Sequence, residues 1–84
     1  MDIEVIRETV KKTISRVTGI DSQTISNTAS FETDLGLDSL SILEISVEVE
    51  SQFKFQSSDE ELSSIRTVED AVNVVKKKLG AEVA

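Results

Sequence analysis

The segment "SLSILEISVEVESQF", residues 39–53, decides the fold class of this chain. Its middle, from Ile45 to Glu50, alternates apolar and polar residues and is rich in β-branched side chains, which alone is typical of a strand. Over the whole segment, the apolar residues instead recur at three- and four-residue steps and form one broad helical face. A run of this length without a turn signal is long for a strand and ordinary for a helix. No partner strand is evident elsewhere, so we predict a helix here.

The N-terminal segment shows a clearer helical pattern. Asp2 can cap its start and Gly19 can end it, and the stripe between them consists of Ile3, Ile6, Val10, Ile14 and Val17. Residues 19–37 follow as a long polar loop with weak periodicity. A loop of this length is expected to be functional or pinned to the core, and the apolar residues expected to pin it are Ile20, Ile25, Phe31, Leu35 and Leu37.

Two capping boxes predict the remaining helices. Ser58 with Glu61 indicates the start of a short helix, and Thr67 with Asp70 indicates the start of a longer one. The apolar stripe of the longer helix consists of Val68, Ala71, Val72, Val75 and Leu79, and Gly80 is expected to end it. The predicted fold class is all-α, with three main helices and one short helix packed as a small bundle.

Length and composition exclude many kinds of protein. With 84 residues, the chain is expected to form a single domain, residues 1–84. It has no Cys and no His, so it lacks a thiol nucleophile, the usual general base and the commonest metal ligand. It has no Trp or Tyr and only three Phe, which provides poorly for stacking on nucleic acid bases.

The charge is negative and uneven. The formal net charge is −7, and residues 21–70 contain twelve acids but only two bases, Lys54 and Arg66. Such a middle repels nucleic acid and anionic membranes and attracts basic protein surfaces, although a solvated, solubilising surface is the simpler interpretation. No signal peptide or membrane span is evident. We therefore expect a cytoplasmic monomer that does not bind nucleic acid.

Ser39 lies in "DLGLDSL", residues 34–40, directly before the ambiguous helix. A catalytic nucleophile would need a nearby base, and a G-x-S-x-G elbow is absent. Asp34, Asp38 and Glu44 lack the register of an EF-hand loop. Two interpretations remain from position alone. Ser39 or Asp38 is a helix cap, or Ser39 is modified by another enzyme, since free N–H groups at a helix start suit a phosphate.

The longer string "FETDLGLDSLSILEISVEVESQF" resembles the acyl carrier protein family, and "LSSIRTVEDAVNVV" resembles its last loop and helix. The resemblance covers nearly the whole chain and implies a four-helix bundle with a short third helix. It implies that Ser39 receives 4′-phosphopantetheine from coenzyme A, through a separate phosphopantetheinyl transferase that uses Mg²⁺. The thiol of this group would hold acyl chains as thioesters. The chain itself would not be an enzyme.

The resemblance also implies partners and further site residues. An acyltransferase and ketosynthase-type enzymes would dock through basic patches onto the helix after Ser39, at Asp38, Leu40, Glu44, Val47, Glu48 and Glu50. The acyl chain would insert between helices, with Leu43, Ile45, Val49, Ile65 and Val72 as candidate contacts. For each of these five residues a plain core role is the alternative.

Three positions depart from the common pattern of fatty-acid carriers. The loop "FQSSDEEL" has no proline, Ser41 stands where an acid is frequent, and Ser46 interrupts an apolar stretch. A fatty-acid pathway and a specialised polyketide pathway therefore both stay open. A peptidyl carrier of nonribosomal peptide synthesis would use the same serine with another cargo. An acidic helical adaptor without a cofactor is the alternative from a different class.

Overall fold

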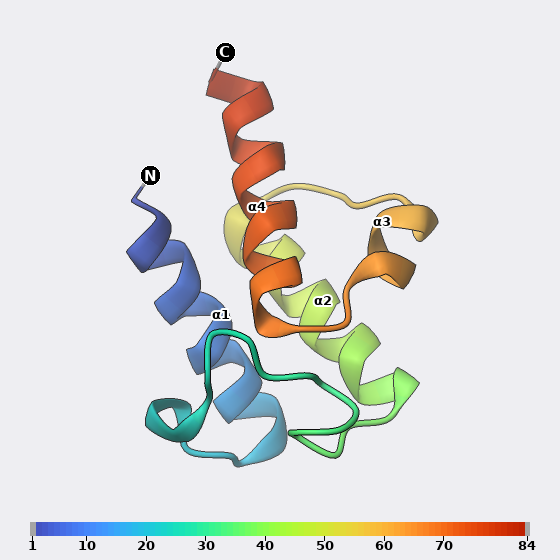
Figure 1. The fold of residues 1–84 in the computed structure, drawn as a ribbon. Coiled ribbons are helices and arrows are strands. Elements are labelled where there is room, and N and C mark those ends of the chain that lie inside the picture. The colour runs from blue at the N-terminus through green and yellow to red at the C-terminus, as the bar shows by residue number, and fades with distance from the viewer. Residues whose placement is uncertain (1, 84) are drawn as a thin grey trace.

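The computed structural model describes the backbone of residues 2–83 and the side chains of residues 2–80. Within that range the chain forms α1 (Ile3–Thr18), the 3-10 helix η1 (Ser22–Thr24), α2 (Ser39–Phe53), α3 (Asp59–Ser64) and α4 (Val68–Val83). Helix α1 packs against both α2 and α4, and the start of α1 and the end of α4 lie at the same end of the bundle (Figure 1). The predicted all-α fold is confirmed, with three main helices and the short α3.

The segment with the strand-like alternation is helical throughout, as predicted. Helix α2 turns Ile45 and Val49 into the core, together with the partly buried Ile42 and Phe53. This face packs on α1 and α4. Burial of one broad apolar face therefore outweighs the β-branched composition, because helical stability in proteins comes mostly from packing.

The core is built from α1, α2, α4 and the long loop between α1 and α2. Its fully buried members include Ile6, Val10 and Ile14 of α1 and Val68, Val72 and Val75 of α4. Ile25 and Phe31 of the loop are buried as predicted, and Ile20, Leu35 and Leu37 are partly buried against the same core. Helix α3 contributes no buried residue.

The long loop is also tied to the start of α4 by backbone hydrogen bonds. The amide of Phe31 donates to the carbonyl of Arg66 at 2.9 Å, and the amide of Val68 donates to the carbonyl of Ala29 at 3.0 Å. These bonds flank an isolated antiparallel bridge between Ser30 and Thr67. The loop before α2 therefore has a defined path, which matters because it leads into the candidate site at the start of α2.

The helix ends follow the predicted capping residues with one exception. Asp2 caps α1, and Gly19 ends it with a left-handed backbone at φ 81°. The Ser58–Glu61 capping box of α3 is present, and Thr67 and Asp70 exchange hydrogen bonds at the start of α4. The prediction that Gly80 ends α4 is wrong, since the helix continues to Val83. Gly80 is not among the residues with positive φ, and a helical glycine costs only about 1 kcal/mol relative to alanine.

The capping box of α3 predicts a pH effect. The backbone N–H of Ser58 and the ammonium of Lys78 stabilise the Glu61 carboxylate and lower its pKa from 4.5 to about 2. Because the pKa is lowered in the folded state, this stabilisation is complete above pH 4.5 and is lost as the pH falls toward 2. In a carbon NMR titration we expect the Glu61 carboxyl to titrate with a midpoint near 2. The neighbouring Glu60→Gln variant should leave that midpoint unchanged, and a midpoint near 4.5 would mean that the box does not form.

Candidate functional site

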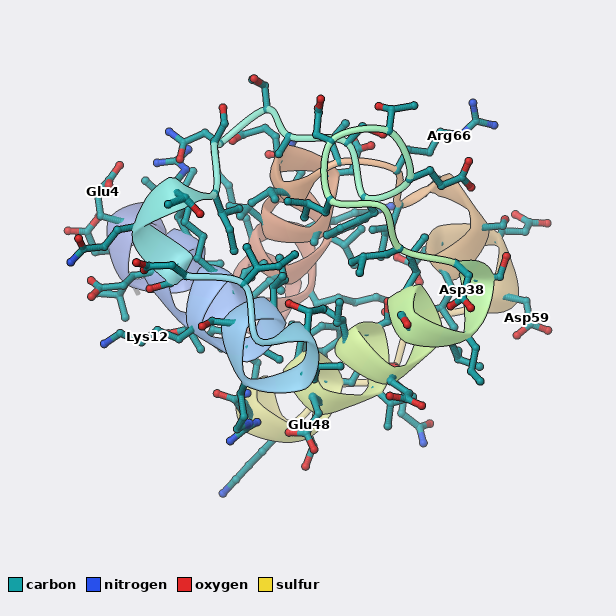
Figure 2. All side chains as sticks on the ribbon, turned by 90° about the horizontal axis from the view of Figure 1, so that it is seen from below. Glu4, Lys12, Asp38, Glu48, Asp59 and Arg66 are labelled. Atoms are coloured by element: carbon teal, nitrogen blue, oxygen red, sulfur yellow. The ribbon has the colours of Figure 1, made fainter. Side chains whose placement is uncertain are left out.

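Ser39 is the first residue of α2 and is exposed. The preceding Asp38 is the N-cap, and its carboxylate accepts a hydrogen bond from the backbone N–H of Ser41 at 2.9 Å. This bond lowers the pKa of Asp38, since it favours the charged form. Asp38, and not Ser39, is therefore the helix cap. Figure 2 shows Asp38 at this end of α2. The Ser39 side chain thus has no capping role.

Each residue before Ser39 has a structural role in presenting it. The Asp34 carboxylate accepts the backbone N–H of Ser30 at 2.7 Å. Gly36 has a left-handed backbone at φ 66°, which favours glycine, and the N–H of Leu37 returns to the carbonyl of Phe31 at 2.8 Å. The motif "DLGLDSL" is therefore a turn that is bonded back to Ser30 and Phe31 and leads directly into the helix.

The helix start gives the Ser39 position a preference for negative charge. The N–H groups of the first helical turn have no partner within the helix, and the helix dipole is positive there. Among the described residues, no group of three acidic, His or Cys side chains is arranged to hold a metal ion. The arrangement suits an anionic group attached to the Ser39 oxygen, as in a phosphodiester.

The predicted docking residues are divided by the structure into a central row and two edges. Leu40 and Val47 are 63% and 54% exposed, and Glu44 is exposed between them. Their spacing of four and three residues places these side chains on one face of α2. At one edge, Glu48 forms an ion pair with Arg16 of α1. At the other edge, Glu50 is half-buried and its carboxylate accepts the backbone N–H of Ser57 at 2.6 Å.

A groove runs from Ser39 between α2 and α3. Its volume is about 880 Å³, and its walls include Ile42, Leu43, Leu62, Ile65 and Arg66. Next to it, a narrow space lined by α2, α3 and α4 leaves only about 10 Å³, the room for about one water molecule. Ser46 borders both spaces, and its hydroxyl donates to the carbonyl of Ile42 at 2.9 Å.

The predicted acyl-contact residues lie at different depths. Leu43 is exposed on the groove wall, whereas Ile65 is buried and borders both the groove and the narrow space. Ile45 and Val49 are buried and line the narrow space. Val72 is buried in the core and lines neither. The structure therefore brings Ser39 together with Leu43 and Ile65, and places the other three deeper.

Several residues of this region were missed by sequence reasoning. Ile42 could have been found, because it belongs to the apolar rows of α2, and Leu62 lies at a helical step from Ile65. No sequence pattern indicated that Arg66 or Arg16 lies in this region. Their positions depend on contacts between distant segments, which no local pattern reports.

The comparisons with known proteins agree with this geometry. A family model described as "Phosphopantetheine attachment site" matches residues 8–75, which is most of the chain. The chain belongs to this family of carrier proteins. Its role is therefore to carry phosphopantetheine, and it is a carrier domain without catalytic activity of its own. The resemblance inferred from the sequence motifs is confirmed.

Two solved structures resemble this carrier along nearly its whole length. One is an acyl carrier protein from Enterococcus faecalis, with a TM-score of 0.75 and 31% identity over 92% of this chain and 98% of the other. The second is the apo doublet acyl carrier protein from prodigiosin biosynthesis, with a TM-score of 0.77 and 30% identity over 88% of this chain. This carrier spans 36% of the doublet. The described helices, within residues 2–83, include none with the length and hydropathy needed to cross a membrane.

Replacement of the carrier's N-cap residue tests the architecture of the site. Asp38→Ala removes the acceptor for the Ser41 N–H, and we expect a measurable decrease in the free energy of unfolding. Amide exchange of Ser41 should become faster. Asp38→Asn keeps an acceptor oxygen and should retain most of the stability. Equal losses in both variants would show that the charge of Asp38, rather than the capping bond, stabilises the helix.

Proposed function

We propose that Ser39 is the residue that carries phosphopantetheine, and that the chain delivers acyl groups to enzymes of fatty-acid or polyketide synthesis. The observation that carries the proposal is an exposed serine at the start of α2, directly after the Asp38 cap, within a chain that belongs to the phosphopantetheine attachment family. A transferase would join the Ser39 oxygen to the phosphate of coenzyme A and release the nucleotide part. The prosthetic group supplies the thiol that this chain lacks.

The residues around Ser39 support attachment at this point. Ser39 is exposed and the turn before it is held by hydrogen bonds to Ser30 and Phe31, so a transferase can reach the oxygen without unfolding the domain. Once attached, the phosphodiester lies at the N-terminus of a fifteen-residue helix, where a negative charge is favoured.

The docking surface that we propose for partner enzymes is the exposed face of α2. Leu40 and Val47 supply apolar contacts, while Asp38 and Glu44 supply charge for a basic partner. The described chain contains no ion pair to Asp38 or Glu44, so no basic side chain balances the charge of either, although Asp38 also accepts the Ser41 N–H. Glu50 is less suited to docking, because it is half-buried and bonded to Ser57.

The groove beside Ser39 is the proposed contact surface for the bound acyl group. Leu43 and Ile65 would contact it first, since they line the groove. Ile45 and Val49 would be reached only if the narrow space next to the groove widened, because it now holds only about 10 Å³. Val72 keeps a core role in this proposal, since it is fully buried and borders neither space.

Mass spectrometry of the intact protein tests the attachment. After incubation with coenzyme A, Mg²⁺ and a broad-specificity phosphopantetheinyl transferase, we expect a gain of one phosphopantetheine, mapped by proteolysis to Ser39. No gain with a transferase that modifies a control carrier would contradict the proposal, provided that the starting mass shows no earlier modification.

Loading assays on the modified protein test the cargo. A malonyl donor with its acyltransferase should give a thioester on the carrier, whereas an amino acid with an adenylating enzyme should not. Loading by the amino acid alone would favour the peptidyl carrier alternative. We also propose that residues 1–84 act as one monomeric domain, which size-exclusion chromatography with light scattering can check.

A further inference from the structure

The ion pair between Arg16 and Glu48 joins α1 to the edge of the proposed docking surface. The guanidinium Nη2 of Arg16 lies 2.5 Å from the Oε2 of Glu48, and the two side chains are 62% and 48% exposed. A pair this exposed contributes little to stability. The pair therefore matters mainly because it changes the net charge of the exposed face of α2.

The pair makes the charge of the α2 surface uneven. Near Ser39, the described chain places no basic side chain in an ion pair with Asp38 or Glu44. One turn beyond Glu44, the charge of Glu48 is balanced by Arg16. A partner that approaches α2 therefore meets the unpaired carboxylates of Asp38 and Glu44 at the Ser39 end, where the groove also presents Arg66, and a balanced ion pair beside Val47.

We propose that Arg16 belongs to the docking surface and removes Glu48 from the set of carboxylates that attract partner enzymes. The partner that fits is an enzyme surface with basic side chains opposite Asp38 and Glu44 and an apolar side chain opposite Val47. This inference rests on the proposed function, since it concerns the enzymes that act on Ser39. Arg16 biases which end of α2 a basic partner engages, because like charges repel where Arg16 lies.

The test is a double-mutant cycle measured on the phosphopantetheinyl transferase reaction. The variants are Arg16→Gln, Glu48→Gln and the double variant, and the readout is kcat/KM for the unmodified carrier at low salt. We expect Arg16→Gln to raise kcat/KM about threefold, because it leaves Glu48 unbalanced. Glu48→Gln should lower it by a similar factor, because Arg16 then repels the partner. The double variant should return close to the parent value.

Lys12→Gln is the matched control. Lys12 also lies on α1 and pairs with an acid, Glu8 at 3.2 Å, but Figure 2 shows it on the opposite side of the molecule from Asp38. Its change in net charge equals that of Arg16→Gln, while kcat/KM should stay near the parent value. High salt should reduce all the differences, since exposed charges are screened.

The outcomes separate this inference from the proposed function. An unchanged kcat/KM in Arg16→Gln would overturn the inference about Arg16, and so would a double variant as slow as Glu48→Gln. In either case Arg16 would have no effect on partner docking. Equal gains in Arg16→Gln and Lys12→Gln would overturn it too, because net charge alone would explain them. If the parent protein is not modified at Ser39 at all, the proposed function fails instead. Circular dichroism of each variant verifies that the helices are intact.

Discussion

Ser39→Ala is expected to abolish modification by phosphopantetheine completely while leaving the fold intact. The hydroxyl oxygen is the atom that would bond to phosphorus, and alanine offers no substitute. Stability should change little, because Ser39 is exposed and Asp38 provides the cap of α2. The measurement is intact-protein mass after incubation with coenzyme A and the transferase, together with thermal unfolding of both proteins.

Ser51→Ala is the matched control for this variant. Ser51 is an exposed serine of the same helix, and its replacement should leave the gain in mass unchanged. A gain of one phosphopantetheine in Ser39→Ala would contradict the proposal and move the attachment to another serine. Loss of modification in both variants would indicate a general defect in recognition of α2 rather than loss of the attachment atom.

Phe31→Ala should produce the largest loss of stability among single core changes. Phe31 is 1% exposed and joins the long loop to the core. Truncation of a buried phenylalanine costs about 3–5 kcal/mol, most of the stability of a small domain. We expect the melting temperature to fall by more than about 12 °C, measured by differential scanning calorimetry.

Phe53→Ala provides the comparison. Phe53 is also an aromatic residue packed against the core, but it is only half-buried at the end of α2. Its truncation should cost less than half as much as that of Phe31. Equal losses would mean that the loop between α1 and α2 contributes no more to the core than a helix end does.

The parts of the fold that follow from neighbouring residues could be predicted from the sequence. The Ser58–Glu61 box and the Asp2 and Gly19 ends depend on contacts within a few residues, and these predictions are confirmed. The helical state of residues 39–53 could also be predicted, but only from the full length of the apolar face. The one wrong boundary, at Gly80, arose because glycine permits a helix end without requiring one.

The candidate site was predictable in its position but not in its electrostatics. The motif around Ser39 indicated the helix start, and the family resemblance suggested the attachment role that we propose for Ser39. No pattern could show that Arg16 lies beside Glu48 or that Ser57 donates to Glu50, since these contacts join separate segments. The sequence therefore shows which charged residues lie on a helix face. Only the structure shows which of them are paired with residues of other segments.

The lack of buried residues in α3 has a consequence for how the domain opens. Helices α1, α2 and α4 share one core, whereas α3 is a six-residue helix held by its capping box, the Glu61–Lys78 pair and partly buried side chains such as Leu62. Local opening free energy follows buried apolar contact, so α3 should be the first element to exchange its amide protons. The α3 side of the groove can then open locally while α2, on the other side, stays folded.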